Sequence, residues 1–294
     1  MSAVKILVAG NSGQVARSLA ALSGERYDFV TLGRPELDLA DAATLEAAVR
    51  EHAPAAIVNA AAYTAVDKAE SEPDAAFAIN RDGAGALAAV AARHGLPIVH
   101  ISTDYVFAGD KAGAYVESDP VGPQGVYGQS KLEGERAVAD ANPAHVILRT
   151  AWVYSPYGNN FLKTMLRFGA DRDRMRVVAD QKGTPTYAPD IAAGIAAVLD
   201  KALAQPEGSD WRGVFNMVSE GDTDWASFAE AIFAESQARG GPHAEVDRIT
   251  TADYPTPASR PANSRLDTAR FRQVFGHALP AWEDGVGRCI DALK

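Results

Sequence analysis

The first residues of the chain constrain its fold more than any other stretch, because a short apolar run leads through a glycine-rich turn into a helical pattern. Residues 4–9 have the composition of a strand that is buried on both faces. From Val15 onward, apolar side chains recur at helical spacing. A strand, a glycine turn and a helix in this order are typical of the first unit of a dinucleotide-binding α/β sheet.

The turn contains the residue types that a pyrophosphate requires. Gly10 permits a tight turn, Gly13 lets the backbone approach a pyrophosphate at the helix N-terminus, and the small Ala16 lets helix and strand pack closely. Because a short glycine string is often only a turn, its position between a strand and a helix carries the prediction. The residues of this turn that we expect to bind the cofactor are Gly10, Asn11, Ser12, Gly13, Gln14 and Val15.

Apolar runs alternate with helical patterns through the first half of the chain, which predicts parallel strands joined by right-handed crossovers. The further runs are residues 27–32, 55–59, 96–101 and 145–149. Beyond Thr150 the rhythm is less regular. We therefore predict an α/β fold with a doubly wound parallel (Rossmann-type) sheet in residues 1–150, to which segments of about 170–220 return. Residues 151–294 form mainly a smaller C-terminal substrate-binding lobe.

The end of the second expected strand bears on the choice of cofactor. Arg34 lies where an NAD-selective site usually carries an acidic residue for the ribose hydroxyls. A guanidinium there can pair with the 2′-phosphate of NADPH, although a solvated surface arginine is an alternative. We predict NADPH as the cofactor, with NADH as the alternative, and we place Asp38 and Leu39 at the adenine edge.

Small side chains follow the third expected strand and leave room for a flat ligand. The residues that this stretch adds to the expected cofactor site are Ala60, Ala61, Ala62, Tyr63 and Thr64. The alanine-rich residues 75–92 are expected to form one packing helix. Within it, Asn80 is either a buried polar group that organises the site or a cap-like residue.

Tyr127 and Lys131 are the strongest candidates for catalysis. They lie four positions apart on an expected helix, so a phenol and an ammonium point toward the same place. A nearby cation stabilises the phenolate and lowers the pKa of the phenol, which makes the pair a proton donor. Thr103 leaves the carboxyl end of the fourth run, where its hydroxyl can hydrogen-bond a substrate carbonyl. The alternative is an ordinary tyrosine and lysine on a helix surface.

Composition and charge argue against several classes of function. The formal net charge is −10 and no basic run occurs, so we expect no nucleic acid and no membrane partner. The first apolar run is too short for a signal peptide or a membrane span, which favours a cytoplasmic location. Cys289 falls on the apolar face of an expected helix, as a packed thiol does. The six histidines form no ligand-spaced pairs, so we predict no metal.

On these motifs the chain resembles the extended short-chain dehydrogenase/reductase family, and within it the sugar-nucleotide reductases. The likeness covers nearly the whole chain, and several of the motifs are specific to the reductase subgroup. The segments that carry it are residues 13–15, 58–62, 64–70, 102–107, 126–128, 149–150, 152–154, 158–161 and 260–266.

The resemblance implies a role for each candidate residue. Tyr127 becomes the proton donor, Lys131 tunes the pKa of that phenol and holds the nicotinamide ribose, and Thr103 orients a keto oxygen. The implied reaction is hydride transfer from NADPH or NADH to carbon 4 of dTDP-4-dehydro-L-rhamnose, giving dTDP-L-rhamnose. The residues expected to face this dTDP-sugar are Thr103, Asp104, Trp152, Asn160 and Arg260.

Three rival interpretations stay open at this point. A 4,6-dehydratase shares the fold, but dehydratases carry a glutamate at the place where this chain has Tyr105. A 4-epimerase differs in holding NAD tightly through many turnovers. A non-catalytic regulatory subunit on the same scaffold has no chemical need for intact Thr103, Tyr127 and Lys131.

Some relatives are metal-bridged dimers held by glutamates, whose places here are Ser18, Pro189 and Ala292. We therefore expect a monomer or a homodimer without assigning a bridging metal.

Overall fold

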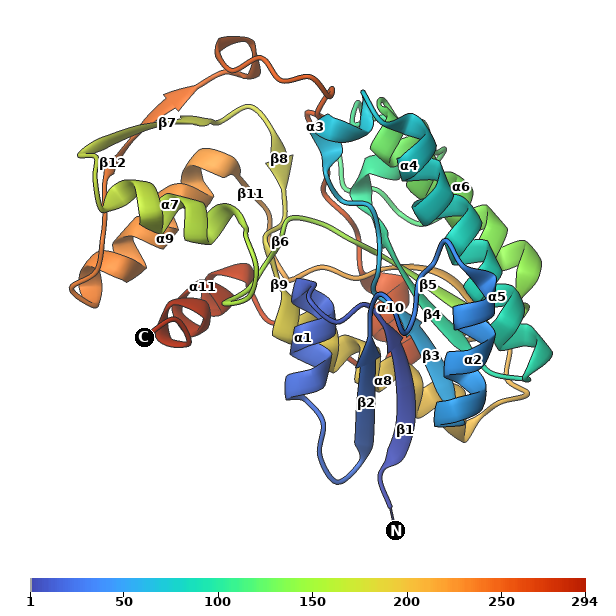
Figure 1. Cartoon of the computed structure of the whole chain (residues 1–294). Coiled ribbons are helices and arrows are strands. Elements are labelled where there is room, and N and C mark those ends of the chain that lie inside the picture. Colours follow the sequence, from blue (N-terminus) through green and yellow to red (C-terminus); the bar gives the residue numbers. More distant parts are fainter. Residues whose placement is uncertain (1) are drawn as a thin grey trace.

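The computed structural model describes residues 2–294, and a six-stranded parallel sheet lies at its centre (Figure 1). The order of the strands across the sheet is β10-β5-β4-β3-β1-β2. These strands are β1 (Val4–Ala9), β2 (Tyr27–Leu32), β3 (Ala56–Asn59), β4 (Ile98–Thr103), β5 (His145–Thr150) and β10 (Gly213–Asn216). From β1 the chain crosses to one side to form β2 and then returns past β1 to form β3. This reversal is the mark of a doubly wound sheet, so the predicted fold class is confirmed.

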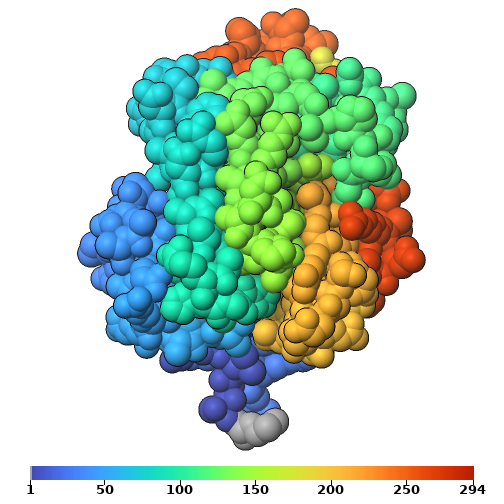
Figure 2. Space-filling model, turned by 90° about the vertical axis from the view of Figure 1, so that its right-hand side faces the viewer, coloured from blue at the N-terminus to red at the C-terminus, as the bar shows by residue number. Residues whose placement is uncertain are grey.

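Helices cover both faces of the sheet. One face packs against α1 (Gln14–Ala21), α8 (Ala188–Ala204) and α10 (Ala269–Phe275), and the other against α2 (Ala42–His52), α5 (Ala84–Arg93) and α6 (Val126–Ala141). The strands supply both apolar layers, because successive side chains of a strand point to opposite faces. In β1, Ile6 and Val8 join the first layer whereas Leu7 and Ala9 join the second. Figure 2 shows the outer surface of the second layer, with α2 in blue, α5 in cyan and α6 in green.

The fourth strand lies two residues further along the chain than the apolar run at 96–101 predicts, since β4 spans Ile98–Thr103. Pro97 has no N–H to donate to a sheet ladder, and this favours a start after it. At the other end, Thr103 pairs in register with Thr150 of β5. Thr103 is therefore the last residue of the strand, and its side chain stands at the carboxyl edge of the sheet.

The prediction of a single helix at residues 75–92 is wrong in one respect, because a π-helical turn interrupts the helix. The segment consists of α4 (Pro73–Phe77), the π-helix η1 (Ala78–Gly83) and α5. A Cβ atom at Gly134 of α6 would overlap the carbonyl oxygen of Asn80, so the missing side chain lets α6 and the π turn approach closely. Such interruptions of a helix are frequent at functional sites.

Several segments after β5 build a smaller lobe with its own apolar core, whereas α8, β10 and α10 return to the sheet. The elements of the lobe are α7 (Phe161–Gly169), β7 (Arg174–Val178), α9 (Trp225–Ala238), β12 (Glu245–Ile249) and α11 (Trp282–Asp291). Cys289 lies in this core, and burial raises the pKa of its thiol to about 12. In Figure 1 the lobe stands to the left of α1. The helices of residues 2–294 include none with the length and apolar character needed to cross a membrane.

Short elements join the lobe to the sheet and complete the chain. Strands pair two by two as β6 (Val153–Tyr154) with β9 (Thr186–Tyr187), and β8 (Lys182–Gly183) with β11 (Thr223–Asp224). The remaining helical turns are α3 (Val66–Ala69), η2 (Asp104–Val106) and η3 (Thr251–Asp253).

Candidate active site

A cleft of about 690 Å³ opens at the carboxyl ends of the central strands, between the sheet and the lobe. In an open α/β sheet this edge, where the direction of the crossovers reverses, is the place where ligands bind. The structure brings most of the predicted site residues to this cleft. Those that line it are Ser12, Gly13, Gln14, Val15, Ala60, Ala61, Ala62, Thr64, Thr103, Asp104, Tyr127, Lys131 and Trp152.

The glycine turn has the shape of a site for a pyrophosphate. Gly10 has a φ of +107°, a conformation that L side chains rarely adopt, and its backbone packs against Ala60 and Ala61. At Gly13 a Cβ atom would meet nothing within 4 Å, so the space above the start of α1 is open. No side chain caps this helix, and its first turn carries no acidic residue. The free N–H groups of the first turn are therefore available to an anion.

Lys131 is buried beneath the cleft with only 2% of its surface exposed. Its Nζ donates a hydrogen bond to the carbonyl oxygen of Ile101 at 2.6 Å and lies 3.4 Å from Nε2 of His100. Burial lowers the pKa of Lys131 to about 8, although the carboxylate of Glu135 acts in the opposite direction. Burial and the neighbouring ammonium hold the pKa of His100 well below its usual value, so this imidazole is neutral.

The phenol of Tyr127 does not have the lowered pKa that the sequence predicts. Burial raises the pKa of Tyr127 to about 12, with the charge of Asp104 acting in the same direction and the hydroxyl of Thr103 in the opposite one. The ammonium of Lys131 is directed to the carbonyl of Ile101 and to His100, and burial of the phenol dominates. The ring of Tyr105 packs edge-on against that of Tyr127, with the centroids 5.6 Å apart. In this arrangement Tyr127 is a phenol that stays protonated at neutral pH.

Thr103 and Asp104 form a buried pair at the end of β4. The hydroxyl of Thr103 donates to Oδ1 of Asp104 at 2.9 Å and accepts a weaker hydrogen bond from the N–H of Tyr105 at 3.3 Å. Oδ2 of Asp104 has no partner of good hydrogen-bond geometry within residues 2–294. Burial raises the pKa of Asp104 to about 6, despite the nearby hydroxyls of Ser264 and Thr103. Asp104 is therefore a cleft residue whose second carboxyl oxygen is buried and not exposed to a ligand in this structure.

Asn80 connects the cofactor loop to the helix of Tyr127. Its amide accepts from the N–H of Tyr63 at 2.8 Å and donates to the carbonyl of Tyr63 at 3.0 Å and to Ser130 Oγ at 2.9 Å. Ser130 in turn donates to the backbone oxygen of Tyr127 at 2.8 Å. Of the two roles considered for Asn80, the structure supports the buried polar group.

An aromatic wall closes the lobe side of the cleft. Trp152 stacks on Trp225 with ring centroids 3.6 Å apart and planes 11° apart, and Phe161 packs on Trp225 at 4.7 Å. Trp152 has a φ of +46°, which is unusual for a bulky residue and costs about 1–3 kcal/mol. A Cβ atom at Gly183 would overlap the indole of Trp152, so only glycine leaves room for this placement. Trp225 is a cleft residue that the sequence did not predict, because no local pattern connects it to Trp152.

The side chains of several predicted ligand residues contact other parts of the protein. Asn160 caps α7, with its Oδ1 accepting from the N–H of Lys163 at 3.1 Å. Arg260 forms an ion pair with Asp67 at 2.8 Å. Leu39 is buried in the second apolar layer. These three side chains lie outside the lining of the cleft, and their expected contacts with a ligand stay predictions. Predicted residues that also lie outside its lining are Gly10, Asn11, Arg34, Asp38 and Tyr63.

These outlying residues nevertheless border the cofactor turn. The side chain of Asn11 packs on Gly33, the residue before Arg34. Arg34 is exposed and makes no ion pair with another residue of the 2–294 range. Asp38 accepts from the N–H of Ala40 at 3.0 Å, and the hydroxyl of Tyr63 donates to Glu72 at 2.9 Å.

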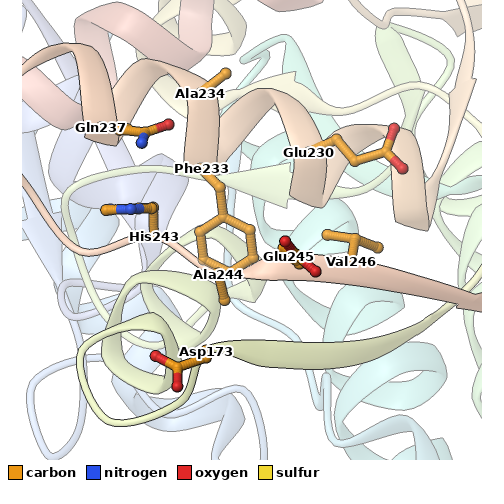
Figure 3. Close-up of a pocket in the computed structure, with 9 residues that line it drawn as sticks. All are labelled: Asp173, Glu230, Phe233, Ala234, Gln237, His243, Ala244, Glu245 and Val246. Atoms are coloured by element: carbon orange, nitrogen blue, oxygen red, sulfur yellow. The ribbon is translucent and has the colours of Figure 1, made fainter.

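A second hollow, of about 760 Å³, lies on the lobe between α9 and β12 (Figure 3). Two of its three acidic groups are engaged elsewhere, since Glu245 pairs with Arg174 at 2.8 Å and Glu230 with Arg248 at 3.0 Å, and the third is Asp173. No residue of the six-stranded sheet lines it. In the part of the chain that the structure describes, no group of three or more acidic, histidine or cysteine side chains is placed to hold a metal ion. We assign the chemistry to the first cleft.

The fold and this cleft define a dinucleotide-binding oxidoreductase. The chain belongs to the family described as RmlD substrate binding domain, whose model matches residues 4–294. It is 49% identical over 290 residues to the dTDP-4-dehydrorhamnose reductase of Sinorhizobium fredii, covering 99% of this chain and 98% of that protein.

Two solved structures are similar over the whole fold. Both are dTDP-4-dehydrorhamnose reductases that match with a TM-score of 0.91 and cover 99% of each chain. One comes from Clostridium acetobutylicum and is 37% identical. The other comes from Bacillus anthracis, is 34% identical, and is in complex with NADP. The resemblance that the sequence motifs predict is confirmed by these relatives.

Burial of the Asp104 carboxyl predicts that Asp104→Asn stabilises the fold. Because one pKa unit corresponds to about 1.4 kcal/mol, ionising this buried group costs the folded state about 2–3 kcal/mol. The raised pKa means that the cost is fully present above about pH 6 and absent below about pH 4. Urea unfolding at several pH values should show a variant that is more stable at pH 8, with a gain that disappears toward pH 4. A variant less stable than the parent at pH 8 would contradict the assignment.

Proposed function

We propose that this protein reduces the 4-keto group of dTDP-4-dehydro-L-rhamnose with NADPH, giving dTDP-L-rhamnose in the last step of dTDP-rhamnose biosynthesis. The observation that carries the proposal is the meeting of Thr103, Tyr127 and Lys131 beside the glycine turn, in a chain whose relatives of similar length are reductases of this name. Thr103 at the end of β4 supplies a hydroxyl to this cleft. Tyr127 and Lys131 of α6 supply a protonated phenol and a buried ammonium.

The cleft fits a dinucleotide. The open space above Gly13 and the free N–H groups of α1 suit a pyrophosphate, and Ala60, Ala61 and Ala62 form a wall of small side chains that suits a flat ring. When bound there, NADPH supplies the hydride for the carbonyl carbon. Arg34, exposed beside the turn, is free to contact a 2′-phosphate.

Tyr127 supplies the proton. With a pKa of about 12 it stays protonated at neutral pH, and it releases the proton only as an alkoxide, a much stronger base, develops on the sugar oxygen. Lys131 supports the phenolate that remains, because its ammonium is charged below about pH 8. The phenolate then regains a proton from solvent, which balances the reaction.

Thr103 and Asp104 orient the sugar in this proposal. The hydroxyl of Thr103 donates its hydrogen bond to Asp104. This hydroxyl can donate to a keto oxygen only after it rotates toward the cleft. Asp104 positions Thr103 in turn, because its Oδ1 accepts from that hydroxyl at 2.9 Å. Tyr105, and not a carboxylic acid, follows Asp104, which disfavours the elimination of water that a 4,6-dehydratase performs.

We also propose that the enzyme works in the cytoplasm, as a monomer or a homodimer. The location fits an enzyme that consumes NADPH and a nucleotide sugar. Among large apolar side chains of residues 2–294, only Val4, Leu22, Tyr254 and Leu293 are exposed, and these scattered positions do not define a dimer surface.

The first prediction from this function concerns the proton donor. Tyr127→Phe should lower kcat by roughly 10²- to 10⁴-fold, the usual value of a positioned acid, and leave the affinity for NADPH unchanged. Absorbance of NADPH follows the rate with dTDP-4-dehydro-L-rhamnose as substrate and the UDP-sugar as a specificity control. Tyr254→Phe is the matched control, because that phenol is 61% exposed and is not among the residues that line the cleft. Unchanged turnover in Tyr127→Phe would remove this residue from the mechanism.

The second prediction concerns the cofactor. Arg34→Ala should weaken NADPH binding by about 10- to 100-fold, as the loss of charge-assisted hydrogen bonds does, and spare NADH. Fluorescence titration with each dinucleotide measures both affinities. Arg26→Ala is a control, since this arginine is occupied by Asp200. Equal weakening of both dinucleotides would show that the 2′-phosphate is not read at Arg34.

A further inference from the structure

The side chain of Gln14 binds the lobe although the residue belongs to the glycine turn. Its Nε2 donates to the backbone oxygen of Val153 at 3.2 Å. Its Oε1 accepts two hydrogen bonds, from Ser155 Oγ at 2.8 Å and from Asn160 Nδ2 at 2.9 Å. The side chain thus fastens the start of α1 to the segment that leads from β5 into α7.

Asn160 holds the other end of this connection. Its Oδ1 caps α7, while its Nδ2 also donates to the backbone oxygens of Ser155 at 2.7 Å and Tyr157 at 3.3 Å. The guanidinium of Arg17, one turn along α1, lies 4.3 Å from the ring centroid of Tyr157. Two independent contacts therefore join α1 to the same short segment of the lobe.

Gln14 also faces the cofactor side of the cleft. It follows Gly13 as the first residue of α1, so its own N–H is among the unpaired donors that a pyrophosphate would meet. The segment that it holds supplies Trp152, Val153, Gly158 and Asn159 to the lining of the cleft. One residue therefore touches the cofactor turn with its backbone and the substrate wall with its side chain.

We propose that Gln14 and Asn160 form a clip that couples binding of the dinucleotide at the glycine turn to binding of the dTDP-sugar against the lobe. The proposal rests on the proposed function and adds a positioning role for two residues that are expected from sequence to be simple ligand contacts. A turn that is fixed by the dinucleotide holds the wall of the substrate site through this clip. Because coupling between two binding sites is reciprocal, the substrate nucleotide tightens dinucleotide binding by the same factor.

The test measures the affinity of the full chain for NADP⁺ by calorimetry, with and without saturating dTDP. The wild-type protein should bind NADP⁺ at least about fivefold more tightly with dTDP present, within the usual range of coupling between sites. Asn160→Asp should reduce this ratio to about one. A carboxylate keeps an acceptor for the cap of α7, whereas it replaces the Nδ2 donor with an oxygen that repels Oε1 of Gln14.

Gln14→Ala is the second variant and should also lose the coupling, and the double variant should lose no more than either single one. The control is Arg288→Gln, which removes the ion pair that joins α11 of the lobe to Asp190 of α8 at 2.5 Å. This variant loosens the lobe without touching the turn, so its ratio should equal that of the wild type.

The outcomes separate the clip from the function. Binding of both nucleotides with no coupling in the wild type, or with coupling kept in Asn160→Asp and Gln14→Ala, would overturn the clip and leave the reductase assignment intact. Loss of coupling in Arg288→Gln as well would also overturn it, since general loosening of the lobe would then explain the effect. If neither nucleotide binds the wild-type protein, the proposed function fails and the clip fails with it.

Discussion

A buried group of charges beneath the cleft is the constraint on which the rest of the site depends. The ammonium of Lys131 donates a hydrogen bond to the carbonyl of Ile101. The negative charge of Glu135 on the same helix attracts this ammonium. Glu135 in turn accepts hydrogen bonds from Ser102 and forms a buried ion pair with Arg149 at 2.6 Å. A buried charge is tolerated only with partners, so α6, β4 and β5 must keep their present register to satisfy all three charged groups.

The same register places the chemistry. Thr103 ends β4, Asp104 follows it, and the first turn of α6 carries Tyr127 over them, so the hydroxyl, the carboxyl and the phenol meet where the strands stop. Burial then sets their protonation in opposite directions, with the pKa values of Tyr127 and Asp104 raised and that of Lys131 lowered. A protonated phenol one helical turn from a buried ammonium on α6 suits the delivery of a proton to a new alkoxide.

The sequence predicts the parts of this site that local patterns specify. The strand-turn-helix of the first residues, the carboxyl edge at Thr103 and the spacing of Tyr127 and Lys131 all follow from periodicity and from the rules of parallel sheets. It does not predict contacts between distant segments. Trp225 reaches Trp152, Arg260 reaches Asp67 and Asn160 reaches Gln14 only through tertiary packing. The spacing of Tyr127 and Lys131 does not predict the raised pKa of Tyr127 for a related reason, because burial cannot be read from residue spacing.

The dependence of turnover on pH tests the central claim most directly, since the account requires a charged Lys131 in a buried place. With saturating NADPH and dTDP-4-dehydro-L-rhamnose, kcat should be level near neutral pH and fall with an apparent pKa near 8, as Lys131 loses its proton while Tyr127 keeps its own. Such a falling limb supports a lysine ammonium as the partner of the phenol. A kcat that stays constant up to about pH 10 would contradict the account, because Lys131 would then be either fully charged throughout or irrelevant to turnover.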